Sequence, residues 1–303
     1  MLGEIFYWVL NMSIASLITG LIIMLIRSFK KLPRRFVLYL WIIPFLRMII
    51  PAAISGKYNL MSVISGITTR TIPVEGGPID MSMMNHVMAA DTYFPITYRT
   101  NLLEDIFDIA SIIWAIIGIA VLLTLGYVYL ITQRELKDMV KLKDNIWISD
   151  KITSPAAYGI FKSKIVIPAG YEKEDLTYVL AHENAHIRHK DNLWRIVAFI
   201  ITAFHWFNPF AWAFLKAFLS DMELACDERV LRKYGETKKK AYAAALVNSI
   251  EHKNVFVSAF GGARIRTRIE NILSYKKISV FSTICFCGLF IIIAYALLTN
   301  ATH

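Results

Sequence analysis

The chain of 303 residues is too apolar for a soluble domain, because 56% of its residues are hydrophobic and its mean hydropathy is +0.49. The net charge of +10 does not indicate nucleic-acid binding, since the cations gather at the ends of apolar runs without a recognition motif. Three cysteines, two of them in one apolar run, exclude a disulfide framework. The totals indicate a membrane protein.

Four apolar runs approach the length of about 20 residues that a bilayer-spanning helix needs. Three of them are plain, at residues 6–26, 109–132 and 278–299. The fourth, residues 36–54, is shorter and holds Pro44, Arg47 and Pro51. We still assign it as a span, with Arg47 close enough to the far end to extend its guanidinium outward. The first run lacks a cleavage site, so we expect it to be retained.

The distribution of Lys and Arg orients these spans. Five lie in the short loop 27–35 and twenty-four in residues 133–277, but the longer segment 55–108 has only three. The positive-inside rule then places residues 27–35 and 133–277 in the cytoplasm. It makes residues 55–108 an extracellular loop and places both termini outside, including the tail 300–303.

A further apolar run, residues 192–221, is long enough to be a fifth span, which would conflict with this topology. If it crossed the membrane once, the twelve Lys and Arg of residues 222–277 would lie outside, against the charge bias. Asn208 and Pro209 fall near its middle, where proline stops the preceding helix. We therefore expect a helical hairpin that dips into the membrane and returns.

The rest of the cytoplasmic region is expected to be one small domain. Short β-branched runs at 145–149 and 164–168 predict a pair of strands, and residues 173–190, 221–235 and 238–253 predict helices. The expected fold is a mainly α membrane protein with about four transmembrane helices and a cytoplasmic domain at 133–277 that carries a small β-sheet.

The motif His-Glu-x-x-His occurs at His182, Glu183 and His186. Residues four apart share a helix face, so both imidazoles can bind one metal ion, with Glu183 placed to take a proton from metal-bound water. The alternative is a solvated helix that happens to carry two histidines. The apolar face of the same helix counts against it, with Leu176, Val179, Leu180 and Ala185.

Catalytic zinc needs a third protein ligand and one open position. We choose Glu223, which can reach the histidines only if residues 192–221 return to their own side of the membrane. Asp227, one turn later, can accept the second N–H of a ligand histidine, or it is an ordinary surface carboxylate. His189 is expected on the helix surface and His205 in interfacial packing, and the Ser-x-x-Lys matches at Ser28 and Ser274 are read as basic membrane anchors.

These residues make the chain resemble the integral-membrane zinc peptidases that act as sensor-transducers of beta-lactam resistance, and their sensorless relatives. The resemblance rests on "HENAH", the later "ELACD" and the preceding "SPAAYGIFKSKIVIP", and it covers nearly the whole chain in span order. It implies Zn²⁺ on His182, His186 and Glu223, with Glu183 as general base. It also implies that an extended substrate pairs with the edge of the strand formed by Lys164, Ile165, Val166 and Ile167.

The drug sensors of that family continue into an extracellular penicillin-binding domain, whereas this sequence stops at His303. The resemblance therefore does not extend to antibiotic sensing by this polypeptide alone.

The sequence thus predicts a gluzincin-like zinc metalloendopeptidase of the cell membrane with a cytoplasmic active site. Its expected partners are the lipid bilayer, a cytoplasmic protein substrate of the transcriptional-repressor type, a second copy in a homodimer, and its own chain, cut between Val255 and Arg264. Direct contact with nucleic acid is not expected. The rival function is a non-catalytic signalling or scaffold protein with a structural metal; a transporter is disfavoured because Arg47 is nearly the only charge in the spans.

Overall fold

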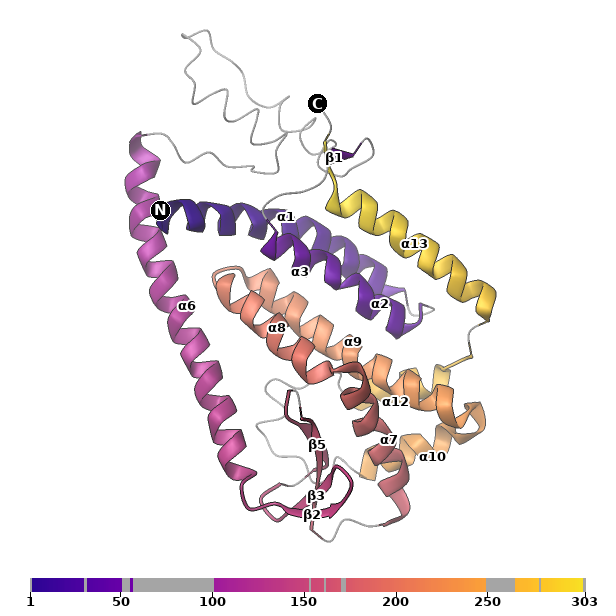
Figure 1. Ribbon diagram of the computed structural model, residues 1–303. Helices are drawn as coiled ribbons and strands as arrows, with labels where there is room; N and C mark the ends of the chain where they lie inside the picture. Colours follow the sequence, from indigo (N-terminus) through magenta and orange to yellow (C-terminus); the bar gives the residue numbers. More distant parts are fainter. Residues whose placement is uncertain are drawn as a thin grey trace.

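The structure is a computed structural model that describes residues 2–29, 32–50, 55–56, 101–152, 154–160, 162–169, 173–248, 265–277 and 279–301. It is mainly helical, and a small four-stranded sheet lies at the end of the molecule away from its first helix, α1 (Leu2–Ser28), and its last, α13 (Val280–Leu298) (Figure 1). The predicted fold class, a mainly α membrane protein with a small β-sheet, is confirmed.

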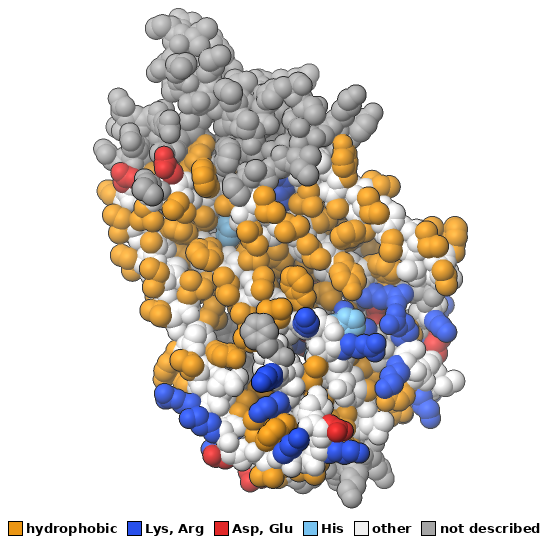
Figure 2. Space-filling model, viewed as in Figure 1, with side chains coloured by type: hydrophobic (Ala, Val, Ile, Leu, Met, Phe, Trp, Pro, Cys, Tyr) orange, Lys and Arg blue, Asp and Glu red, His pale blue; other side chains and the backbone are white. Residues whose placement is uncertain are grey.

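Three helices in the described part of the chain are long and apolar enough to cross a membrane: α1 (Leu2–Ser28), α6 (Asn101–Glu135) and α13 (Val280–Leu298). α1 and α6 contain the first two plain runs of the sequence, and α13 covers residues 280–298 of the third. In the most apolar 18-residue stretches of α6 and α13, only 22% and 6% of the residues are buried inside the protein. Figure 2 shows the result, a broad hydrophobic band with Lys and Arg gathered below it. Such a band is suited to lipid.

The fourth predicted span is broken. Residues 36–54 contribute to two short helices, α2 (Arg34–Leu40) and α3 (Ile42–Ile49), that meet at Trp41. Pro44 explains the break, because its ring excludes the carbonyl of Leu40 and it has no N–H to donate. The structure corrects the expectation for Arg47. Its side chain is buried, and its Nε donates to the carbonyl oxygen of Leu297 at 2.7 Å, so it caps the end of α13 instead of reaching outward.

Two antiparallel helices, α8 (Asp191–Phe204) and α9 (Pro209–Tyr234), occupy the region where the sequence predicts a hairpin (Figure 1). Asn208 begins α9 by accepting a hydrogen bond from the backbone N–H of Phe210, and Pro209 takes the first helical position. The helix predicted at 221–235 is therefore the second half of α9. It ends as predicted, at Gly235.

One face of α9 is fixed to the first two helices. Phe214 packs so closely on Gly20 of α1 that a Cβ there would lie 2.1 Å from its ring. Further along α9, the carboxylate of Asp221 accepts hydrogen bonds from Nε of Arg27 at 2.8 Å and Nε1 of Trp41 at 2.9 Å. Glu228, two turns later, accepts from the first backbone N–H groups of α2.

The sheet contains β2 (Val140–Lys143), β3 (Ile146–Ser149), β4 (Ala156–Tyr158) and β5 (Lys164–Pro168) in the order β2-β3-β5-β4. The two predicted strands, β3 and β5, pair in parallel, and β4 pairs antiparallel with β5. Gly159 makes the turn after β4 at φ +92°, where a Cβ would lie 2.7 Å from the carbonyl oxygen of Lys162.

Helix α7 (Lys173–His189) packs between this sheet and α9, and two further helices pack against α7 and α9. These are α10 (Lys239–Asn248) and α12 (Ile265–Ser274), whose shared core contains Val230, Leu231, Tyr242, Leu246 and Ile272. The helix predicted at 238–253 is confirmed to Asn248, and its last residues lie outside the described part of the chain.

Candidate metal centre

His182 and His186 lie one turn apart on the buried face of α7. Their side chains are 9% and 6% exposed, and the two Nε2 atoms are 3.2 Å apart. Zinc–nitrogen bonds of about 2.0–2.1 Å at tetrahedral angles place two ligand nitrogens about 3.3 Å apart. The histidines thus already have the spacing that one zinc ion requires.

Glu223 comes to the same point from α9. Its Oε2 lies 3.5 Å from Nε2 of His182, and its Oε1 lies 3.7 Å from Nε2 of His186. Burial acts to raise the pKa of Glu223, but the two imidazoles and Arg268 outweigh it and hold that pKa well below its usual range. A further cation, Arg195 on α8, donates to Oε1 at 2.5 Å. The carboxylate is therefore ionised and faces both histidines.

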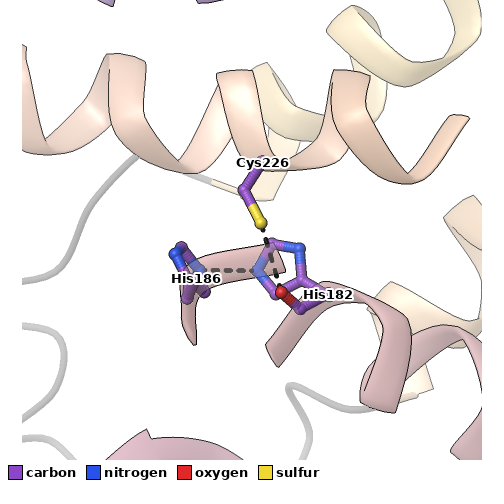
Figure 3. A group of neighbouring side chains, drawn as sticks. All are labelled: His182, His186 and Cys226. Carbon is purple, nitrogen blue, oxygen red and sulfur yellow. Dashed lines mark hydrogen bonds between the residues drawn. The ribbon is translucent and has the colours of Figure 1, made fainter. Parts of the chain in front are cut away.

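Cys226 is a second possible third ligand, drawn with the histidines in Figure 3. Its Sγ and one nitrogen of each histidine lie within 4.8 Å of one another. The thiol is fully buried and lies 3.3 Å from the backbone carbonyl oxygen of His182, to which it donates. Glu223 fits better, because its oxygens have near-ligand spacing to both Nε2 atoms and it lines the adjoining cavity.

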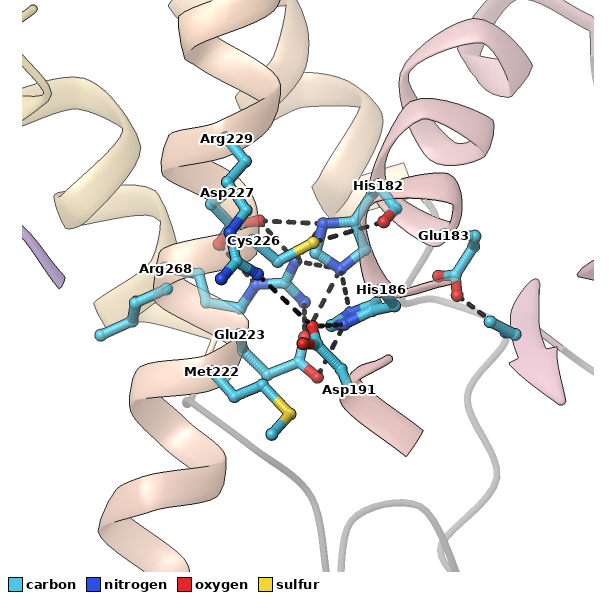
Figure 4. A network of polar contacts seen from close by, with 12 residues as sticks. His182, Glu183, His186, Asp191, Met222, Glu223, Cys226, Asp227, Arg229 and Arg268 are labelled. Carbon is cyan, nitrogen blue, oxygen red and sulfur yellow. Dashed lines mark hydrogen bonds and ion pairs between the residues drawn. The ribbon is translucent and has the colours of Figure 1, made fainter. Parts of the chain in front are cut away.

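Each histidine has a carboxylate at its other ring nitrogen (Figure 4). Nδ1 of His186 lies 2.7 Å from Oδ2 of Asp191, and Nδ1 of His182 lies 3.3 Å from Oδ1 of Asp227. A carboxylate at Nδ1 favours the tautomer that leaves Nε2 free for a metal. Asp191 reaches back because Lys190, between α7 and α8, adopts a left-handed conformation at φ 55°.

Asp227 is held in turn by two side chains from outside α7 and α9. Arg268 of α12 donates to both of its oxygens, from Nε at 2.8 Å and from Nη2 at 2.7 Å, and the hydroxyl of Tyr242 donates to Oδ1 at 2.6 Å. Burial acts to raise the pKa of Asp227, but the Arg268 guanidinium prevails and lowers it to about 2. The carboxylate beside His182 is thus a fixed, ionised acceptor.

Glu183 points to the other side of α7, toward β4. Its Oε2 accepts a hydrogen bond from the backbone N–H of Ala157 at 2.8 Å, and Asn192 of α8 donates to the carbonyl oxygen of the same residue at 2.9 Å. In an antiparallel pair, the N–H and C=O of one residue point to the same side. Since those of Ala157 bond to Glu183 and Asn192, both face away from β5. Glu183 and Asn192 therefore occupy the outer edge of β4.

A cavity of about 140 Å³ connects this edge with the histidines. Its lining includes polar residues of the site, namely His182, Glu183, His186, Asn192, Arg195, Glu223 and Arg268, and apolar residues from β4, α7 and α10, among them Ala156, Val179 and Leu246. The cavity brings an open strand edge, a carboxylate and a set of metal donors to one place.

The strand expected to receive a substrate needs a correction. Residues Lys164 to Ile167 belong to β5, which has β3 on one edge and β4 on the other. An added strand finds no free backbone groups there. Among the described strands, β4 has the free edge beside the histidines, and it was missed because its three residues, Ala-Ala-Tyr, are too short to give a strand pattern.

Two other histidines lie elsewhere. His189 lies one turn beyond His186 and is partly exposed, and burial together with the nearby Arg229 lowers its pKa. His205 is buried at the turn between α8 and α9, where its Nε2 lies 3.0 Å from the carbonyl oxygen of Met48. The segment predicted for self-cleavage, 255–264, lies outside the described residues.

Comparison with known proteins places the chain in a family. A family model described as BlaR1 peptidase M56 matches residues 7–272. Regulatory protein BlaR1 of Bacillus licheniformis is 28% identical over 147 residues, 43% of this chain and 24% of the relative. The Staphylococcus aureus protein of the same name is 29% identical over 160 residues, 48% and 27% respectively. Methicillin resistance mecR1 protein of Staphylococcus aureus (strain Mu50 / ATCC 700699) is 26% identical over 143 residues, 43% and 24%.

The matched segment spans about a quarter of the length of these relatives. The family model, in contrast, covers most of the chain, from α1 to α12, and includes every proposed metal ligand. The resemblance stated from the sequence is confirmed: the chain belongs to the BlaR1 peptidase M56 family.

Proposed function

We propose that this protein is a membrane-embedded zinc metalloendopeptidase that cleaves a regulatory protein on the cytoplasmic side. The observation that supports this most strongly is the convergence of three donors, Nε2 of His182, Nε2 of His186 and the carboxylate of Glu223, at distances of 3.2–3.7 Å beside an open cavity. Three protein ligands with room for a water are the arrangement of catalytic zinc.

Zinc held by these residues would polarise the scissile carbonyl and lower the pKa of its bound water toward about 7. Asp227 and Asp191 lie at the second ring nitrogens of the histidines, which would leave both Nε2 lone pairs for the ion. Glu183 would serve as the general base, taking a proton from the attacking water and returning it to the leaving amine. To do so, its carboxylate must first release the N–H of Ala157.

An extended peptide binds along the outer edge of β4 in this proposal. The N–H and C=O of Ala157 would pair with the backbone of the peptide, replacing Glu183 and Asn192. Binding of the substrate then frees the general base at the moment when it is needed.

The names of the relatives support a proposal for the substrate class. The two similar BlaR1 proteins are named as regulatory, and the mecR1 protein is named for methicillin resistance. We infer a repressor-like cytoplasmic protein as substrate, with cleavage of the chain itself between residues 255 and 264 as a second reaction.

Incubation of the full chain in detergent with repressor-like proteins tests this proposal. We expect fragments that need zinc, disappear with a chelator and are absent from the Glu183→Ala protein, which should still bind zinc. Fragments that persist in Glu183→Ala, or in chelator, would assign the cleavage to another protease and overturn the proposal.

The proposed sidedness has a separate test. A membrane-impermeant thiol reagent applied to intact cells should label a cysteine at Gly77 and miss one at Lys239, which lies at the start of α10. Labelling at Lys239 would place the metal centre outside the cell and remove the cytoplasmic substrate from consideration.

A further inference from the structure

Arg268 connects the last helix before α13 with the metal centre. It lies on α12, 41 residues after Asp227 and 86 after His182 in sequence, and it is only 4% exposed. Its helix is kept in place by Ile272, which is fully buried in the core shared by α9, α10 and α12. A cation buried so deeply is rare without a partner of opposite charge.

The nearest partner of Arg268 is Asp227, and the contact is bidentate, whereas Nη1 of Arg268 lies 3.4 Å from Oε2 of Glu223. Nε and Nη2 donate to the two carboxylate oxygens at 2.8 and 2.7 Å, which fixes the plane of the carboxylate as well as its position. Tyr242 adds a third hydrogen bond at 2.6 Å. The oxygen that faces Nδ1 of His182 therefore cannot rotate away.

Arg268 is a cation close to the metal site, and it need not compete with the metal for His182. Nη2 also lies 3.1 Å from Nε2 of His182, and a metal bound to that nitrogen would take its lone pair. The two bonds to Asp227 use no atom of His182 and can persist. Because Asp227 balances the charge of Arg268 in one contact, the pair brings no net charge toward a dication.

We propose that Arg268 is a positioning residue of the metal centre, acting through Asp227 on His182, so that α12 completes the site. This rests on the metal site proposed above. The inference concerns metal affinity and not hydrolysis, because Arg268 contacts Asp227, His182 and Glu223 and is not required to touch a substrate.

Zinc titration of the full chain in detergent, in competition with a chromogenic chelator, tests the inference. Arg268→Gln should bind zinc about 10- to 100-fold more weakly, the loss that follows removal of a group that orients a ligand. Arg268→Lys keeps the buried charge but donates from a single point, so it should also bind zinc more weakly. Arg266→Gln, on the same helix but with its side chain 89% exposed, is the matched control and should bind like wild type.

Thermal unfolding in chelator shows whether each variant is folded before zinc is added. If Arg268→Gln does not fold, Arg268→Lys decides. Wild-type or tighter zinc affinity in the folded variant would overturn the inference, and tighter affinity would identify Arg268 as a competitor of the metal. The outcome is independent of catalysis, since a wild-type chain that binds zinc but cuts no peptide refutes the proposed function and leaves the role of Arg268 intact.

Discussion

The carboxylate of Glu183 accepts a hydrogen bond from the backbone N–H of Ala157 at 2.8 Å, so the proposed general base and the free edge of β4 hold one another. Ala157→Pro removes this N–H from an edge strand, where proline is tolerated. We expect KM for a peptide substrate to rise about tenfold, because the added strand loses a backbone bond, while zinc binding stays unchanged. Ala157→Ser, which keeps the N–H, is the control. An unaltered KM in Ala157→Pro would exclude β4 as the binding edge.

Two substitutions distinguish Glu223 from Cys226 as the third metal ligand. Glu223→Gln should lose zinc, because a neutral amide is a poor replacement for a charged oxygen ligand, whereas Cys226→Ser should keep both zinc and activity. Metal content of the purified proteins, measured by mass spectrometry, gives the result. Loss of zinc from Cys226→Ser would point to a closed four-ligand site and favour a structural metal in a non-catalytic signalling or scaffold protein.

Asp191 should matter nearly as much as a ligand. Asp191→Ala leaves Nδ1 of His186 without its acceptor at 2.7 Å, so the ring loses its fixed orientation. We expect zinc affinity to fall about 10- to 100-fold. The control is His189→Gln, which changes a partly exposed histidine on α7, the helix of His186, and should leave zinc affinity at the wild-type value. Equal affinities in both variants would show that Asp191 has no role in metal binding.

Asp221 should be important for stability and not for metal binding. Asp221→Ala leaves the guanidinium of Arg27 and the indole of Trp41 without their shared acceptor. Because Arg27 is partly exposed and the indole of Trp41 is buried, the loss of their acceptor should cost about 1–3 kcal/mol. Thermal unfolding in detergent should therefore show a clearly lower Tm. Ser220→Ala removes only one bond at 3.2 Å to Arg27 and should unfold near the wild-type temperature; a similar Tm in both variants would refute the prediction.

The lowered pKa of Asp227 predicts that the folded protein loses stability in acid. This pKa is about 2 in the folded protein against an ordinary value of 3.8, so the unfolded chain binds more protons between these pH values. The contribution is complete above about pH 4 and is lost as the pH falls toward 2, and it amounts to about 2 kcal/mol. Unfolding in chelator between pH 5 and pH 2 should be less pH-dependent in Asp227→Asn than in wild type. Parallel curves would show that Arg268 does not hold the carboxylate ionised.

The features that the sequence predicted are local or follow from a simple balance of charge. The spacing of His182, Glu183 and His186 on one helix is local, and the charges after residue 221 required a hairpin that brings Glu223 back to them. The break between α2 and α3 could have been predicted from Pro44, whose ring would clash with the carbonyl of residue 40 in a continuous helix.

The features that were missed depend on long-range contacts or unusual backbone. Asp191 reaches His186 only through the positive φ of Lys190, a conformation that lysine rarely adopts. Arg268 is one arginine among many in a basic region, and nothing near it in sequence indicates that it pairs with Asp227. The short strand β4 is formed by its pairing with β5 and has no alternating pattern of its own.

The cap that Arg47 places on α13 bears on how a cut chain would behave. Arg47 binds the carbonyl oxygen of Leu297 at the end of α13, Glu236 accepts from the backbone N–H of Lys277 before its start, and Arg268 anchors α12. A nick between residues 255 and 264 would break none of these bonds. The two pieces should therefore stay together as a noncovalent complex that purifies as a single species in mild detergent. They would separate only on denaturing gels, so native chromatography alone would miss the cleavage.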